Sequence, residues 1–519
     1  MTDRQTAPPS KKKKNSDDIT NVTCSQQRVT TDTTAVRSDS NCGNWLEGKS
    51  LVVYLPAFCF HCEQIEHYCF VGIASSALDC LCFSCALVNM LIGRLEQHLL
   101  LTALLSLVTA TPIMYTLTTV DNEKYPNALC LDGSPAGFWF NKGTGTGATK
   151  YIIHHQGGAW CTSARDCMER SKTAQGSSDS WDKEVNCEYS KATPCSYDGG
   201  AHGMFSSDAT MNPLSYNWNK VYVGYCDGAS FSGAKKEKAS NGLHYKGYFI
   251  LGAIYSTFFD KFGMEKATEV VITGTSAGGL SVMLHVDQIA DLIKSKAPTS
   301  PRVVGVADAG LFMDLPSYKG EYTYTPLFKD IYEFQQVSRS LGTDCKSKHT
   351  QDDAYKCFIG QYAINYVKTP MFITNSLYDV YQHYRFMVLQ CNPVPGATHG
   401  VCNKNHITYM NNYRDTMVDT IEKYLKEHPE SGAWAVSCWI HPIKNHENFW
   451  DDIKAGESKA VAATLKKTFI AWYEDQGSNP GGSKFVKIDG AWGSNQCGYE
   501  KPFETGSSSS RRKLQLRLG

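Results

Sequence analysis

Residues Val270–Leu284 read VVITGTSAGGLSVML, in which three glycines and Ser276 lie between two apolar runs. The apolar, β-branched start predicts a strand, and the residues after Gly278 predict a helix. At the junction, Gly274, Ser276 and Gly278 form the pattern G-x-S-x-G. Glycines permit a tight strand-to-helix turn that leaves Ser276 Oγ exposed, so we interpret the stretch as a nucleophile elbow.

Two other interpretations of this turn stay open from the pattern alone. It could be an ordinary strand–helix turn with a capping serine, because G-x-S-x-G is common by chance. A phosphate cradle is less favoured, since the stretch matches neither G-x-x-x-x-G-K-[ST] nor G-x-G-x-x-G.

Strand-like and helix-like segments alternate on both sides of the turn. Near-continuous apolar strands joined by helices indicate an α/β fold with a mostly parallel sheet covered on both faces. A stretch rich in Ser, Asp, Asn and Gly, residues 170–219, predicts a long irregular insertion. The expected strands are 151–158, 220–228, 268–274, 302–310, 369–379 and 432–442, and the expected helices are 244–263, 278–295 and 409–428.

Composition narrows the class of protein. The chain has 519 residues, and its 51 Lys and Arg balance its 51 Asp and Glu. No net positive charge therefore favours the binding of nucleic acid.

Of 20 cysteines, twelve follow residue 90. An even set of that size suggests disulfides formed in an oxidising compartment. The short loops Cys161–Cys167 and Cys345–Cys357 are the first pairs to expect.

Residues 90–110 have the layout of a secretory signal: Arg94 early, an apolar run, and small residues before a cleavage site after Ala110. The expectation is that residues 1–89 are a poorly defined extension outside the mature protein. The alternative is a membrane anchor formed by the apolar region 68–110, although charged residues interrupt it.

The N-terminal extension also contains two C-x-x-C pairs at a spacing that zinc sites use. Their surroundings are apolar and lack the glycine turns of a zinc ribbon. We therefore expect no metal there. The cysteines concerned are Cys59, Cys62, Cys82 and Cys85.

A nucleophilic serine needs a base and an acid that orients it, and both follow later strands in hydrolases of this kind. Asp379 directly follows one expected strand, and His441 directly follows another. Asp308 also ends a strand and is the rival acid. The competing histidines are His399, His406 and His446.

The oxyanion of such a reaction needs backbone N–H groups, one after the nucleophile and others from an earlier loop. Ala277 provides the first. The loop in HHQGGAWC provides Gly158 and Ala159, where glycine lets the backbone approach closely. The plainer interpretation of that loop is a glycine turn. Trp160, next in the chain, could line a sugar-binding cleft or belong to the core.

Five motifs together resemble the pectin acetylesterase family, which also includes the carboxylesterase Notum. They run in family order from about residue 129 to 441: LCLDGSPAGFWFNKGTGTGATKYIIHHQGGAWC, NWNKVYVGYCDGASFSG, VVITGTSAGGLSVMLHVDQ, CFIGQYAINYVKTPMFITNSLYDVYQ and SCWIH. The resemblance implies an α/β-hydrolase-like fold with disulfide-linked insertions, here residues 121–500. The composition of residues 501–519, rich in Ser and Arg, predicts a flexible tail. The resemblance also implies secretion and serine-dependent ester hydrolysis without a cofactor or metal.

The resemblance places the catalytic serine, acid and histidine on Ser276, Asp379 and His441, and the oxyanion donors on Gly158, Ala159 and Ala277. This chain departs from the family at three points. Thr275 stands where many members have Cys, and Ala159 where many have Gly. After His441, PIKNH replaces a Cys that often follows.

The function expected from these features is removal of O-acetyl groups from cell-wall pectin by a secreted carboxylesterase. A Notum-like deacylase of a lipid or protein acyl ester is the alternative. A non-catalytic carbohydrate-binding protein is a third interpretation, which the complete Ser-Asp-His set disfavours.

Overall fold

The computed structural model describes residues 114–187, 203–393, 400–443, 450–456, 458, 461–475, 485–492 and 497, all within a unit that spans 105–519. The expected extension, signal segment and tail, 1–89, 90–110 and 501–519, lie outside the described residues. So do the C-x-x-C cysteines. Among the described residues, no helix is long and apolar enough to cross a membrane.

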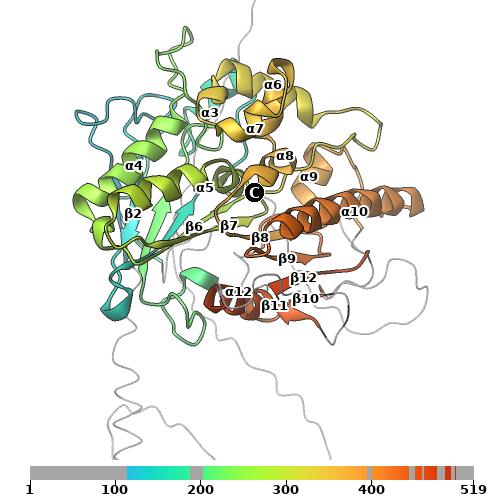
Figure 1. Cartoon of the computed structure of the whole chain (residues 1–519). Helices are drawn as coiled ribbons and strands as arrows, with labels where there is room; N and C mark the ends of the chain where they lie inside the picture. Colours follow the sequence, from blue (N-terminus) through green and yellow to red (C-terminus); the bar gives the residue numbers. More distant parts are fainter. Residues whose placement is uncertain are drawn as a thin grey trace, which may run out of the picture. The chain divides into compact units, whose positions relative to one another are not determined.

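Ten described strands form one sheet, and seven of them run parallel. Figure 1 shows this sheet edge-on between layers of helices. In order across the sheet the strands are β12 (Val486–Ile488), β9 (Gly432–Val436), β8 (Met371–Ser376), β7 (Arg302–Asp308), β6 (Glu269–Thr275), β3 (Lys150–His155), β5 (Asn219–Val223), β2 (Gly137–Asn141), β1 (Met114–Thr119) and β4 (Glu184–Asn186). A separate hairpin pairs β10 (Lys454–Ala455) with β11 (Ala463–Thr464).

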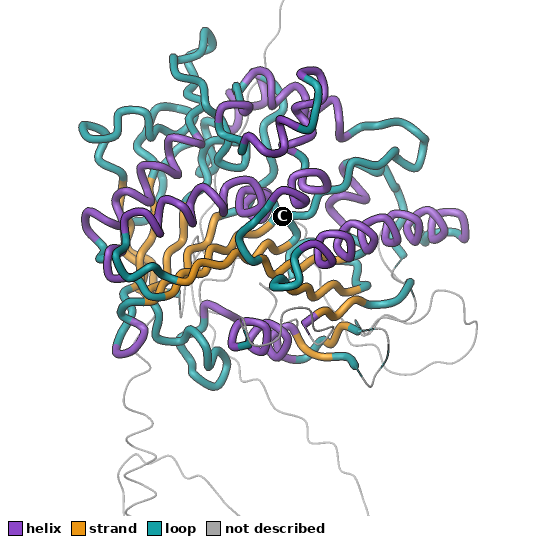
Figure 2. Tube along the Cα trace, in the orientation of Figure 1, coloured by secondary structure: helices purple, strands orange, loops and turns teal. Residues whose placement is uncertain are grey.

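Helices cover both faces of the sheet, which is why central strands such as β6 and β7 are buried from their second residue to their last. Helices α4 (Gly247–Lys261), α5 (Ala277–Lys296) and α10 (Lys404–Glu427) lie on one face, and α12 (Leu465–Glu474) lies on the other (Figures 1 and 2). The other described α-helices are α3 (Ala164–Arg170), α6 (Tyr324–Phe334), α7 (Thr343–Ser347), α8 (Gly360–Ala363) and α9 (Val380–Arg385).

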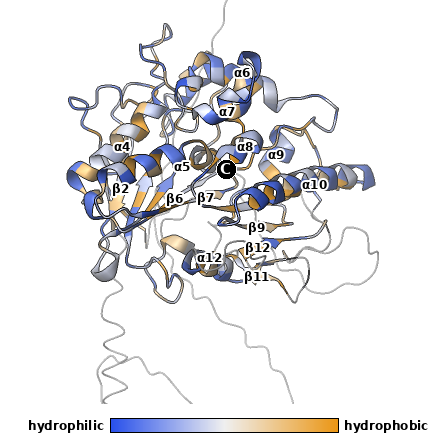
Figure 3. Ribbon diagram, in the orientation of Figure 1, coloured by the Kyte–Doolittle hydropathy of each residue, from blue (hydrophilic) through white to orange (hydrophobic). Residues whose placement is uncertain are grey.

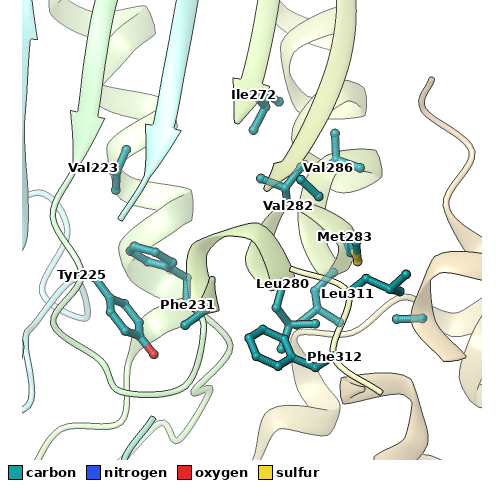
Figure 4. Packing of buried hydrophobic residues seen from close by; sticks show 14 of the residues in the cluster. Val223, Tyr225, Phe231, Ile272, Leu280, Val282, Met283, Val286, Leu311 and Phe312 are labelled. Carbon is teal, nitrogen blue, oxygen red and sulfur yellow. The ribbon is translucent and has the colours of Figure 1, made fainter. Parts of the chain in front are cut away.

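Alternate residues of β6 enter different hydrophobic clusters, as the two-residue period of a strand requires. Val270 and Ile272 pack with α4, α5 and α10, whereas Val271 packs on the α12 side. Figure 4 shows part of the first cluster, with Ile272 of β6 and Val282 of α5 among its side chains. The central strand is therefore held from both faces.

Close packing of α5 on the sheet depends on Gly305 of β7. A Cβ at this position would lie 2.2 Å from Met371 Sδ and 3.2 Å from side-chain carbons of Val282 and Val286. Helix α10 instead contacts the sheet through large residues spaced three or four apart, such as Met410, Tyr413 and Met417. Figure 3 shows hydrophilic positions along the rest of this helix.

The expected α/β architecture and mostly parallel sheet are confirmed, but three strands at one edge were missed. β1 and β4 are antiparallel to their neighbours, and β2 pairs antiparallel with β5. Part of residues 170–219, expected to be irregular, forms β4 and the start of β5. The segments MYTLTT of β1 and GFWFN of β2 are rich in residues that favour strands, but their antiparallel pairing is set by distant segments and is not visible in the local sequence.

Two expected disulfides are confirmed, Cys161–Cys167 and Cys345–Cys357. Three further pairs join the described residues: Cys130–Cys226, Cys391–Cys402 and Cys438–Cys497. Such bonds persist in oxidising compartments.

Candidate active site

The turn between β6 and α5 has the geometry of a nucleophile elbow. Ser276 has φ +58° and ψ −122°, a conformation that non-glycine residues rarely adopt. A Cβ on Gly274 would lie 2.2 Å from the carbonyl oxygen of Gly278, and a Cβ on Gly278 would lie 2.1 Å from that of His155. Both glycines of the motif are therefore required for the chain to turn this tightly.

A chain of hydrogen bonds joins Ser276, His441 and Asp379. Ser276 Oγ and His441 Nε2 are 2.8 Å apart, and His441 Nδ1 and Asp379 Oδ2 are also 2.8 Å apart. A carboxylate can only accept, so Nδ1 carries the proton and Nε2 accepts from the serine hydroxyl. Asp379 is fully buried, whereas the His441 side chain is 13% exposed. The histidine is thus reachable, and the acid is not.

The loop after β8 fixes Asp379 for this contact. The other carboxylate oxygen of Asp379 caps helix α9 by accepting a hydrogen bond from the Gln382 N–H at 3.0 Å. Its backbone carbonyl accepts from His383 Nδ1–H at 2.8 Å. Burial lowers the pKa of His383 to about 4, so this histidine is neutral and serves as a donor at ordinary pH. On the other side, the Tyr381 ring stacks on His441.

The rival acid Asp308 has a different set of partners. Its buried carboxylate accepts from Thr275 Oγ1 at 3.2 Å, from Thr374 Oγ1 at 2.9 Å and from the Ile443 N–H at 3.2 Å. Its backbone oxygen accepts from the Ser276 N–H at 2.8 Å. Asp308 therefore connects the elbow to the loop that carries His441.

Of the three histidines that compete with His441, only His406 is among the described residues, and it takes no part in the hydrogen bonds between Ser276, His441 and Asp379. His406 caps the start of α10, its Nδ1 accepting from the Asn403 N–H at 3.2 Å. His399 and His446 lie outside the described residues.

The glycine loop after β3 lies against the elbow. A Cβ on Gly157 would be 2.3 Å from the Thr275 carbonyl oxygen and 3.1 Å from Ser276 Cβ. Gly158 has φ +144° and Ala159 has φ +57°. Within the described part of the chain, the N–H groups of Gly158 and Ala159 have no hydrogen-bond partner. The Ala277 N–H, at the start of α5, has none either. All three can donate to a ligand.

Trp160 lies on the same loop but faces inward. It is 7% exposed, its Nε1–H donates to Ser230 Oγ at 2.7 Å, and its ring packs against Phe312 and Phe328. Phe312 in turn lies 6.1 Å from the His441 ring, centroid to centroid. Trp160 thus belongs to an aromatic cluster beside the histidine, and its predicted contact with sugar stays a prediction.

Sequence reasoning missed the residues that hold the glycine loop. Arg170 donates to the Gly158 carbonyl at 2.7 Å, and Tyr225 donates to the Ala159 carbonyl at 2.8 Å. Neither residue lies in a motif that signals such contacts.

Among the described residues, two groups of side chains lie close enough together to hold a metal ion, but both contain a disulfide. Cys345 and Cys357 flank His349, and Cys391 and Cys402 lie near His406. Disulfide sulfurs are not thiolates and cannot serve as thiolate ligands.

Comparison with known proteins identifies relatives over most of the chain. The family model described as Pectinacetylesterase matches residues 108–498. Pectin acetylesterase 5 of Arabidopsis thaliana is 31% identical over 360 residues, covering 67% of this chain and 78% of the relative. The palmitoleoyl-protein carboxylesterase NOTUM of Schmidtea mediterranea is 26% identical over 372 residues, covering 66% and 65%.

Among solved structures, the Wnt deacylase Notum from Drosophila aligns with a TM-score of 0.57 at 22% sequence identity, covering 70% of this chain and 93% of that one. At this identity the match establishes a common fold, and the fold is of the α/β-hydrolase type.

We can test whether Asp308 connects the elbow to the His441 loop by removing the hydroxyl of Thr275, which donates to the Asp308 carboxylate. Thr275→Val keeps the side-chain shape but removes one donor to a buried carboxylate, so we expect a loss of about 1–3 kcal/mol in the free energy of unfolding. Thr275→Ser restores the hydroxyl and should recover most of that loss. Denaturant unfolding of the two variants measures the difference. Equal stability of the valine and serine variants would contradict this assignment.

Proposed function

Because this chain belongs to the pectinacetylesterase family and is a carboxylic ester hydrolase, we propose that it is a secreted serine esterase that removes acetyl groups from pectin. The observation that carries the proposal is the continuous hydrogen-bonded chain from Ser276 through His441 to Asp379. This arrangement activates a serine for attack on an ester.

In the proposed reaction, Ser276 Oγ forms a bond to the acetyl carbonyl carbon while His441 Nε2 takes the hydroxyl proton. Asp379 holds the imidazole and stabilises its cation. The N–H groups of Gly158, Ala159 and Ala277 bind the negative oxygen of the tetrahedral intermediate. The bond to the sugar oxygen then breaks, and His441 returns its proton to that oxygen.

The second half of the reaction repeats these steps with water. His441 deprotonates a water molecule, which attacks the acetyl–Ser276 ester, and the bond to Oγ breaks. Acetate leaves, and the proton returns to the serine.

A Notum-like deacylase is the second candidate, and one observation bears on it. Apolar rings lie beside His441, where a fatty acyl chain would need to lie. These rings contact one another: Phe312 and Phe328 each lie within 5 Å of Trp160, and Tyr324 lies 4.5 Å from Phe386, centroid to centroid. Apolar rings at this place suit a long acyl chain as well as an acetyl group, so the preference for acetyl rests on the higher identity to pectin acetylesterase 5 (31%) than to NOTUM (26%). A non-catalytic carbohydrate-binding role is least supported, because the hydrogen-bonded chain is complete.

Ser276→Ala removes the nucleophile and leaves the backbone of the turn unchanged. We expect acetate release from acetylated pectin to fall by at least about a thousandfold, with the melting temperature close to that of the unchanged protein. An acetate assay beside thermal unfolding checks both results. Activity near the original level in the folded variant would contradict the assignment of Ser276.

A substrate panel separates the two esterase functions. We expect the highest kcat/KM on acetylated pectin, lower values on acetylated xylan, and the lowest on long-chain acyl esters, because the chain is more similar to pectin acetylesterase 5 than to NOTUM. A preference for the long-chain esters would favour the Notum-like alternative.

Secretion is part of the proposal and rests on the disulfides and on the signal-like residues 90–110. If signal peptidase cleaves after Ala110, the secreted protein begins at Thr111. Mass spectrometry of the N-terminal peptide of the natural protein measures this directly. Peptides from residues 1–89 in the secreted protein would contradict the proposed processing.

A further inference from the structure

Three consecutive carbonyl groups of the glycine loop are bound by side chains from outside the loop. Gln175 Nε2 donates to Gly157 O at 3.4 Å, Arg170 Nη2 to Gly158 O at 2.7 Å, and Tyr225 Oη to Ala159 O at 2.8 Å. The two shorter contacts come from Arg170 and Tyr225.

Each carbonyl contact also fixes an N–H group. A peptide unit is planar and trans, so the C=O of one residue and the N–H of the next point in opposite directions. The bond from Arg170 to the Gly158 carbonyl therefore sets the direction of the Ala159 N–H, and the bond from Gln175 sets that of the Gly158 N–H. These are two of the proposed oxyanion donors.

Arg170 affects the strength of the Ala159 N–H as a hydrogen-bond donor as well as its direction. A cationic donor on a carbonyl oxygen draws electron density toward that oxygen, which makes the N–H of the same peptide a stronger donor. The backbone conformation needs such support, because Ala159 has φ +57°, where a residue with a Cβ is strained.

The surroundings hold the guanidinium rigidly. Arg170 is the last residue of α3, whose Cys167 is bonded to Cys161 next to the glycine loop. Its Nε donates to the Gln175 carbonyl at 3.0 Å, and its guanidinium carbon lies 5.1 Å from the centre of the Tyr225 ring. Gln175 and Tyr225 are themselves the two other side chains that bind the loop.

We infer that Arg170 is a positioning residue for the oxyanion hole, holding the Gly158–Ala159 peptide so that the Ala159 N–H meets the tetrahedral intermediate. Tyr225 supports Ala159 from its other side, by holding the Ala159–Trp160 peptide through the Ala159 carbonyl. This inference rests on the proposed serine esterase function and deepens it. Arg170 itself contacts no reacting atom.

The test compares Arg170→Met with a matched control, Arg302→Met. Arg302 makes the same two kinds of contact elsewhere: it donates to the Tyr473 carbonyl at 2.6 Å and lies 3.9 Å from the centre of that ring. Both substitutions remove a partly buried guanidinium from a carbonyl and an aromatic face. Only one of them acts on the glycine loop.

With p-nitrophenyl acetate as substrate, we expect kcat of Arg170→Met to fall ten- to a hundredfold, because losing an oxyanion donor outright costs about 10²- to 10³-fold. KM should change less than threefold. The Ki of methylboronic acid, which forms a tetrahedral adduct with a catalytic serine, should rise with the loss in kcat. Arg302→Met should have the kcat and Ki of the unchanged protein, even if its melting temperature is lower.

Two further variants cover the case in which Arg170→Met does not fold. Arg170→Lys retains a cationic hydrogen-bond donor and should therefore have a higher kcat than Arg170→Met. Tyr225→Phe removes only the hydroxyl and should lower kcat three- to tenfold, again without a matching change in KM.

The outcomes distinguish the inference from the function on which it rests. If the unchanged protein shows no p-nitrophenyl acetate hydrolysis that Ser276→Ala removes, the esterase proposal fails, and the inference fails with it. If that hydrolysis is present but the folded Arg170 and Tyr225 variants keep the kcat and Ki of Arg302→Met, the inference alone is wrong.

Discussion

The candidate active site depends on one backbone constraint, the reversal at Ser276. Its φ of +58° turns the chain from β6 into α5 within a single residue. The turn fits only because Gly274 and Gly278 carry no Cβ where the chain passes over itself and over His155. The strain at Ser276 is offset by the surrounding sheet and helix, and it is what presents the serine hydroxyl to the loops that follow neighbouring strands.

Parallel strands place the remaining groups, because their carboxyl ends share one edge of the sheet. β3 leads into the glycine loop, β8 into Asp379 and β9 into His441. Asp308, at the end of β7, bonds across three adjacent strands and reaches the histidine loop. Residues far apart in sequence are thus held to fixed distances by strand register, while side chains such as Arg170 adjust the loops between strands.

The sequence predicted those parts of the candidate site whose residue types occur in a recognisable order along the chain. The elbow follows from a local glycine pattern. The rule that acid and base follow later strands left Asp308 as a rival to Asp379 and other histidines as rivals to His441, and the family resemblance selected Asp379 and His441. The edge strands β1, β2 and β4 could not be predicted, because their pairing is set by distant segments. The position of Asp308 at the end of a strand marked it as a candidate acid, but its actual role appears only in its tertiary contacts. Nothing in the sequence around Arg170 or Tyr225 predicts that these residues bind the glycine loop.

The central claim is that Ser276 is the nucleophile of this esterase. Labelling with a fluorophosphonate followed by peptide mass spectrometry tests it most directly, because the probe bonds only to a serine activated by its neighbours. We predict one adduct, on the peptide that contains Ser276, and a much slower reaction after His441→Ala. An adduct on a different residue, or none in the folded protein, would contradict the claim.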